Sequence, residues 1–142
     1  MKRLVIDTNV VLDALLPDGE RPHGDRSSAL LILEAVARRN VVGLLSPVVF
    51  SELVHVTKPR RADRAAAAKA LEFLLDICEW TPITADTYRN ALDSSFKDVN
   101  DAAIFFAASR PTTVVTRNTK DFRDHVNVEV LTAAEFVRKH LK

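Results

Sequence analysis

The sequence predicts a single α/β domain with a central parallel sheet of four or five strands, flanked by helices on both faces. Its 142 residues are the length of one domain of ordinary size. Short apolar, β-branched runs alternate with longer segments of helical periodicity, and no clear hairpin turn joins two strands. Strands that are separated by helices form βαβ units, which give a parallel sheet covered on both faces.

The first half of the chain is expected to contain two strands and three helices. Pro17 ends the first helix, and the polar segment after it, which contains two of the three glycines, predicts a loop. Ser46 and Pro47 predict a helix start, with serine as N-cap and proline at the first helical position. In chain order we expect a strand at 4–6, a helix at 10–16, a loop at 17–26, a helix from 27 or 28 to about 39, a strand at 41–45 and a helix from 46 that ends before 59.

The second half predicts three more strands. A β-branched run at 112–116 favours a strand, and Thr132 is expected to cap the last helix. In chain order we expect a basic connection at 58–64, an alanine-rich helix at 65–77, a weak strand at 80–83, a helix from 84 or 85 to about 93, an apolar helix at 98–108, a strand at 112–116, a polar turn at 117–122, a strand at 128–131 and a helix from 132 to about 141.

The composition excludes several classes of protein. Hydrophobic residues make up 47% and charged residues 27% of the chain, a balance that argues against disorder. One cysteine excludes an internal disulfide framework and a cysteine-rich zinc site, and the four histidines lack metal-ligand spacing.

No apolar stretch is long enough to span a membrane, because Asp7 and Asp13 interrupt the first apolar run. We therefore expect a soluble, cytoplasmic protein. The net charge of +1 allows nucleic-acid binding only through a local patch.

Acidic and polar side chains gather where the predicted strands end. Asp7 follows the first strand directly, Glu52 lies early in the helix after the second, and Asp98 and Asp101 share a face at the start of an apolar helix. In parallel sheets, ligands bind at the carboxyl ends of the strands, near the point where the strand order reverses. The polar residues that follow the fourth strand join this candidate site; they are Thr116, Asn118 and Asp121.

Each of these residues also has an ordinary structural interpretation. Asp7 can cap the helix that follows it, and Asp98 can cap a helix with Asp101 at its third position. Glu52 can be a solvated surface residue, although its apolar neighbours favour a buried or cleft-facing position. The polar residues after the fourth strand can hold a turn.

The acids as a set point to a divalent cation. Carboxylates that are pressed against a buried helix repel one another unless positive charge lies between them, and hard cations prefer oxygen ligands. Bound Mg²⁺ or Mn²⁺ can orient and activate water for in-line attack on a phosphodiester. The residues therefore predict a metal-assisted hydrolase.

Four short motifs in order along the chain resemble PIN-domain proteins, and most of all the compact toxin ribonucleases of toxin–antitoxin pairs, the VapC type. The motifs are DTNV at 7–10, SELV at 51–54, D-x-x-D-A at 98–102 and TRNTKDF at 116–122. The resemblance covers essentially all of residues 1–142. It implies one PIN-like domain, an acidic pocket and Mg²⁺- or Mn²⁺-dependent RNA cleavage. It also implies a cognate antitoxin partner and a homodimer.

The resemblance assigns roles to particular positions. It implies that the catalytic acids are Asp7, Glu52, Asp101 and Asp121, and that the metal ligands are Asp7, Asp98, Asp101 and Asp121. Asp98 shares a region with Asp101, which is the better match because it directly precedes Ala102. The matching polar residues, which would orient the acids or contact phosphate, are Thr8, Asn9, Thr116 and Asn118.

The densest basic run lies between two predicted helices and consists of Lys58, Arg60, Arg61 and Arg64. It is either a solvated face or a contact for the RNA backbone at the mouth of the acidic pocket.

Two other functions remain open on the sequence. One is a non-catalytic PIN-like module that binds RNA or protein, although none of the acids is missing. The other is a phosphatase with an aspartyl nucleophile, for which Asp7 is suitably placed. Such phosphatases usually have a second aspartate two residues later, and here that residue is Asn9.

Overall fold

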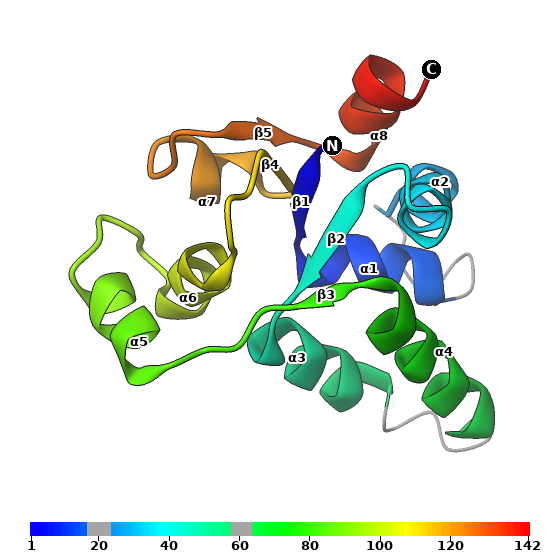
Figure 1. The fold of residues 1–142 in the computed structure, drawn as a ribbon, viewed down its shortest axis with the longest axis horizontal. Coiled ribbons are helices and arrows are strands. Elements are labelled where there is room, and N and C mark those ends of the chain that lie inside the picture. The colour runs from blue at the N-terminus through cyan, green and yellow to red at the C-terminus, as the bar shows by residue number, and fades with distance from the viewer. Residues whose placement is uncertain (17–23, 58–63) are drawn as a thin grey trace.

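The computed structural model describes residues 1–16, 24–57 and 64–142, and its described part contains a five-stranded sheet (Figure 1). The strands are β1 (Arg3–Ile6), β2 (Val42–Leu45), β3 (Glu79–Trp80), β4 (Thr113–Val115) and β5 (Glu129–Leu131). They are all parallel, in the order β3-β2-β1-β4-β5. The chain builds outward from β1 in one direction and then returns to its other side, so the strand order reverses between β1 and β4. This confirms the predicted fold class.

Helices cover both faces of the sheet, as the sequence predicts. A π-helical turn at Val137–Leu141 follows the last α-helix and continues it to the end of the expected helical segment. The α-helices of the described residues are α1 (Thr8–Leu15), α2 (Arg26–Ala37), α3 (Pro47–Thr57), α4 (Arg64–Ile77), α5 (Ala85–Leu92), α6 (Val99–Ala107), α7 (Thr119–Arg123) and α8 (Ala133–Phe136). None of them combines the length and the apolar character that crossing a membrane requires.

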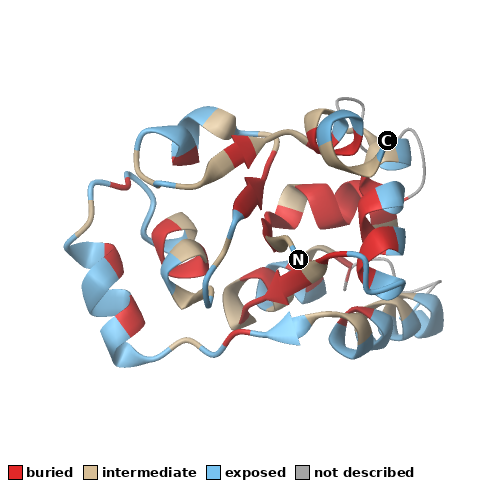
Figure 2. Cartoon of the chain, turned by 45° about the horizontal axis from the view of Figure 1, so that its top comes forward, coloured by how far each residue is buried: buried red, intermediate tan, exposed pale blue. Residues whose placement is uncertain are grey.

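The core lies around the two central strands. Most residues of β1 and all of β4 are buried on both faces, as expected for parallel strands between helix layers. Figure 2 shows the same concentration of buried residues in these strands and in α1, whereas β3 at the edge is exposed. The strand ends that adjoin the point of reversal are therefore anchored in the best-packed part of the molecule.

Two predicted elements differ from the structure. The segment 117–122, expected as a turn, contains the short helix α7, which forms because Phe122 turns into the core and is completely buried. The third strand comprises Glu79 and Trp80 instead of 80–83. Pro82 has no N–H to donate to a neighbouring strand, so pairing ends before it. The predictions for residues 17–23 and 58–63 fall outside the described residues.

Candidate active site

Asp7 lies at the point where the strand order reverses. Its backbone N–H donates to the carbonyl of Val115 on β4 at 2.9 Å. Its Oδ1 accepts the N–H of Thr8 at 2.8 Å, and its Oδ2 accepts the hydroxyl of Thr116 at 2.8 Å. The residue is only 8% exposed. Both carboxylate oxygens are therefore held in fixed directions, and the predicted N-cap role of Asp7 for α1 is confirmed.

Asp98 and Asp101 stand together at the start of α6. Asp98 is the N-cap of this helix, since its Oδ1 accepts the N–H of Asp101 at 3.0 Å. The capping arrangement predicted from the sequence is therefore present. Asp98 is exposed and Asp101 is half-buried, which leaves carboxylate oxygens of this pair available to a ligand.

The carboxyl groups lie close enough to raise one another's pKa. Burial, together with smaller contributions from repulsion by Asp7, Asp98, Asp121 and Glu52, raises the pKa of Asp101 to about 7. Burial also raises the pKa of Asp7, while its two hydrogen bonds lower that pKa and repulsion from Asp121 and Asp98 raises it again. Every acid that the sequence selected therefore contributes to one local field.

Glu52 reaches this group from α3. Its side chain is exposed, which matches a surface position and not the buried one that its apolar neighbours favoured. Burial of part of the carboxyl group raises the pKa of Glu52, and repulsion from Asp7 raises it further. The helix α3, which follows β2, thus supplies an acid to the same edge of the sheet.

The polar residues after β1 and β4 support the acids in different ways. The Thr116 hydroxyl is completely buried; it donates to Asp7 and accepts the N–H of Asn118 at 3.1 Å, which fixes the turn that leads into α7. Asn118 precedes α7, and its side chain does not cap the helix. Asn9 lies in the first turn of α1 and lines a second pocket with Asn118. Thr116 therefore holds the bend at 116–118, while the rest of the segment expected as a turn enters α7, which carries Asp121.

Thr8 places a buried hydroxyl beside the acids. Its Oγ1 is buried, the residue is 5% exposed, and this atom makes no hydrogen bond of normal geometry with the described residues. Buried hydroxyls are normally satisfied. The hydroxyl lies near the Glu52 carboxyl and moderates the increase in the Glu52 pKa. An unsatisfied hydroxyl beside repelling carboxylates is suited to a hydrated cation.

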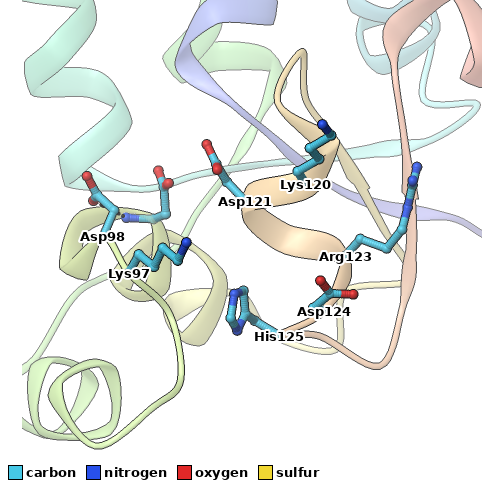
Figure 3. A pocket seen from close by; sticks show the side chains of 8 residues that line it. Lys97, Asp98, Lys120, Asp121, Arg123, Asp124 and His125 are labelled. Atoms are coloured by element: carbon cyan, nitrogen blue, oxygen red, sulfur yellow. Dashed lines mark hydrogen bonds between the residues drawn. The ribbon is translucent and has the colours of Figure 1, made fainter.

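An open pocket of about 750 Å³ adjoins the acids (Figure 3). It lies between the start of α6 and the helix α7. In Figure 3 the carboxylates of Asp98 and Asp121 face the same side of the pocket, and the ammonium group of Lys97 reaches into its middle. The residues that line it are Lys97, Asp98, Asp101, Lys120, Asp121, Arg123, Asp124 and His125.

The donor set fits a hard divalent cation in its chemistry. The gathered ligands are carboxylate oxygens, with hydroxyl oxygens beside them, and this is the preference of Mg²⁺ and Mn²⁺. Within residues 1–16, 24–57 and 64–142, no three His, Cys, Asp or Glu side chains already stand in an arrangement that could hold an ion. Binding would therefore require the exposed carboxylates, such as Asp98 and Asp121, to turn toward the ion.

The predicted basic run is described only in part. Arg64 begins α4, is exposed and does not line the acidic pocket. Lys58, Arg60 and Arg61 lie outside the described residues. A contact between this run and RNA therefore stays a prediction.

Sequence reasoning overlooked residues beside the acids. Asp13 on α1 is 4% exposed, and its Oδ1 is 3.7 Å from Nη1 of Arg117, which lies between Thr116 and Asn118. The signal was available, because an acid in an otherwise apolar helix needs a partner. Lys97 and His125 were also overlooked as pocket residues, since nothing in their local sequence distinguishes them from surface residues.

We expect the metal-free protein to lose stability as the pH rises toward neutrality. Asp101 has a pKa of about 7 in the folded chain and about 3.8 when unperturbed, so the folded state binds more protons between these values. Its protonated form thus contributes stability that is fully present below about pH 4 and is lost as the pH rises through about 7. Thermal unfolding in a chelator, from about pH 5 to about pH 8, should show a decreasing Tm.

The matched variant for this measurement is Asp101→Asn, which cannot ionise. Its Tm should fall less over the same pH range, and added Mg²⁺ should raise the wild-type Tm most at the upper end. An equal fall in Tm for both proteins would contradict the assignment of this titration to Asp101.

Comparison with known proteins supports the same family. The family model for the PIN domain matches residues 3–120. Among solved structures, the chain is similar to the crystal structure of VapBC2 from Rickettsia felis bound to a DNA fragment from their promoter, with a TM-score of 0.64 and 21% sequence identity. That match covers 92% of this chain and 97% of the matched chain, and it shows a shared fold. The sequence has no significant match among the curated proteins. Because the family model spans most of the chain, the protein belongs to the PIN-domain family.

Proposed function

We propose that this protein is a divalent-metal-dependent endoribonuclease that hydrolyses RNA phosphodiester bonds, and that it acts in the cytoplasm as the toxin of a toxin–antitoxin pair. PIN domains are typically nucleases, which supports a hydrolase at the level of the family. The observation that carries the proposal is the buried carboxylate of Asp7, fixed by Thr8 and Thr116 within the field of four other acids.

The residues divide the chemistry among them. Asp7, Asp98, Asp101 and Asp121 would hold Mg²⁺ or Mn²⁺, which would supply Lewis acidity and lower the pKa of a bound water. Thr116 keeps Asp7 in its orientation through the 2.8 Å hydrogen bond to Oδ2. Glu52, whose pKa is raised, is suited to accept a proton from the attacking water at a carboxylate oxygen. Asn9 and Asn118 would offer polar groups to the phosphate, and Thr8 would orient Asp7 through its N–H.

A direct assay separates the three candidate functions. The purified protein is incubated with RNA, and separately with a generic phosphomonoester, in Mg²⁺, in Mn²⁺ and in a chelator. The nuclease proposal requires RNA cleavage that the chelator abolishes. Hydrolysis of the monoester alone would favour the phosphatase. RNA or protein binding without hydrolysis of either substrate would favour the non-catalytic module.

We also propose a homodimer that is held in check by an antitoxin. A solved structure with a similar fold is VapBC2 bound to a DNA fragment from their promoter, and this supports an antitoxin partner. Large apolar side chains are exposed on several elements of the described chain, and exposed apolar patches often mark interaction surfaces. They include Leu30, Leu31, Phe73, Leu75, Trp80 and Leu92.

The dimer is tested by sedimentation of the isolated protein. At tens of micromolar, roughly the range in which a modest interface holds, we expect twice the mass of one chain. A monomer at that concentration would contradict the proposal.

A further inference from the structure

We propose that Lys97 and His125 form a binding subsite for the phosphodiester next to the one that is cleaved. The ligand is a phosphate of a single-stranded RNA, bound beside the carboxylates in the same pocket. The inference rests on the proposed nuclease function, and it concerns residues that the catalytic assignment leaves unused.

The His125 ring is held in place from a second segment of the chain. Its Nδ1 lies 2.7 Å from the Ser95 hydroxyl, and its ring centroid lies 5.0 Å from that of Phe96 with 31° between the planes. The backbone N–H of His125 donates to the carbonyl of Phe122 at 2.9 Å. The segment between α5 and α6 therefore fixes a ring that belongs to the end of α7.

The support under this ring is rigid. Phe96 is buried and contacts three further aromatic rings, those of Phe105, Phe106 and Phe122. The ring of His125 thus packs on an aromatic cluster, and His125 also lines the pocket. With Nδ1 engaged by Ser95, Nε2 has no hydrogen-bond partner within the described part of the chain, so it can serve a ligand.

Lys97 supplies the positive charge. It is exposed, it directly precedes Asp98, and no other described residue forms an ion pair with it. In Figure 3 its ammonium group lies in the middle of the pocket, on the side of His125, while Lys120 and Arg123 extend away from Asp98. Lys97 is therefore the lysine of this pocket that can reach a ligand lying beside the acids.

An RNA strand at this pocket needs such a group. A cation at the acids would attract the phosphate that is cleaved, but four aspartates line the pocket, Asp124 among them, and they repel the neighbouring phosphates. A flexible ammonium group acts as a point charge for phosphate. In the tautomer in which Nδ1 accepts the Ser95 hydroxyl, the N–H at Nε2 of the fixed imidazole adds direction. Together, Lys97 and His125 favour one path of the RNA backbone past the proposed metal site.

The test measures binding of a short, fluorescently labelled, single-stranded oligoribonucleotide as a function of salt. An Asp101→Asn background keeps the RNA intact. Lys97→Ala should weaken binding about tenfold and reduce the slope of log affinity against log salt by about 0.7, the value for one phosphate on a single strand. His125→Phe, which keeps a ring on Phe96, should weaken binding about fivefold. Lys97→Arg should restore most of the affinity.

The matched control is Lys69→Ala, which removes an exposed lysine of α4 away from the pocket and should leave affinity and slope unchanged. The proposal is wrong if Lys97→Ala and His125→Phe bind RNA with the affinity of the Asp101→Asn protein. It is equally wrong if Lys69→Ala lowers RNA affinity as much as Lys97→Ala does. It is also wrong if these variants bind RNA normally but lose a cognate antitoxin, because the subsite would then serve a protein. Failure of the nuclease proposal can be told apart from failure of the subsite proposal, because in that case the wild-type chain would not cleave RNA.

Discussion

Replacing Asp7 with asparagine should lower metal-dependent RNA cleavage about a thousandfold, equivalent to ~4 kcal/mol in the activation free energy. The substitution removes the negative charge from the carboxylate that both Thr8 and Thr116 orient. It keeps an oxygen that can accept the N–H of Thr8, and asparagine is a good N-cap. The helix α1 should therefore form as before, so the loss of cleavage would be chemical and not a consequence of unfolding.

The matched control is Asp76→Asn, which makes the same change at an exposed position of α4 that is not part of the acidic field. Initial rates of cleavage in Mg²⁺ and in Mn²⁺ are compared for the two variants, and circular dichroism checks that both are folded. Asp76→Asn should cleave at the parental rate. If folded Asp7→Asn also did so, the catalytic assignment would be withdrawn.

The second large effect is expected in the core under the site. Phe122 is completely buried in α7, directly after Asp121, and its ring packs edge-on against Phe96 at 5.7 Å. Phe122→Ala should lower the free energy of unfolding by about 3–5 kcal/mol, because it removes a large buried ring and leaves a cavity. Cleavage should fall as well in the fraction that remains folded, since α7 carries Asp121 and leads into His125.

The matched control is Phe106→Ala, which removes an exposed phenylalanine ring instead of a buried one. Phe106 contacts the same Phe96 ring at 6.0 Å, but it lies on the surface of α6 and is 38% exposed. Its replacement should cost about 1 kcal/mol or less. Urea unfolding of both variants measures the difference, and equal destabilisation would show that the buried ring does not anchor α7.

Much of the fold could be predicted because its signals are local. Strands buried on both faces read as short apolar runs, and the helix starts at Ser46-Pro47 and at Thr132 follow from capping chemistry. The segment 117–122 was misjudged because a five-residue helix is too short to show periodicity. Its formation depends on Phe122 entering a core that other elements build, and no local pattern reports that.

The acids were predictable for a different reason. The aspartates follow a strand or lie at the start of a helix, and a parallel sheet brings those positions to one edge whatever the details of packing. The partners that fix them were harder to foresee. The hydrogen bond from Thr116 to Asp7 joins residues 109 positions apart, and the Ser95–His125 contact joins residues 30 apart. Such pairs depend on tertiary placement, so a single sequence contains no spacing that identifies them.

The position of β4 beside β1 also determines when the acidic site can first assemble during synthesis. The chain must supply about the first 115 residues before Val115 can pair with Ile6 and Asp7 can receive the hydroxyl of Thr116. Contacts between such distant segments form late because closing a long loop is entropically costly. A growing chain on the ribosome therefore lacks the assembled acidic site until Thr116 has been added. The proposed nuclease would be inert up to that point of its synthesis.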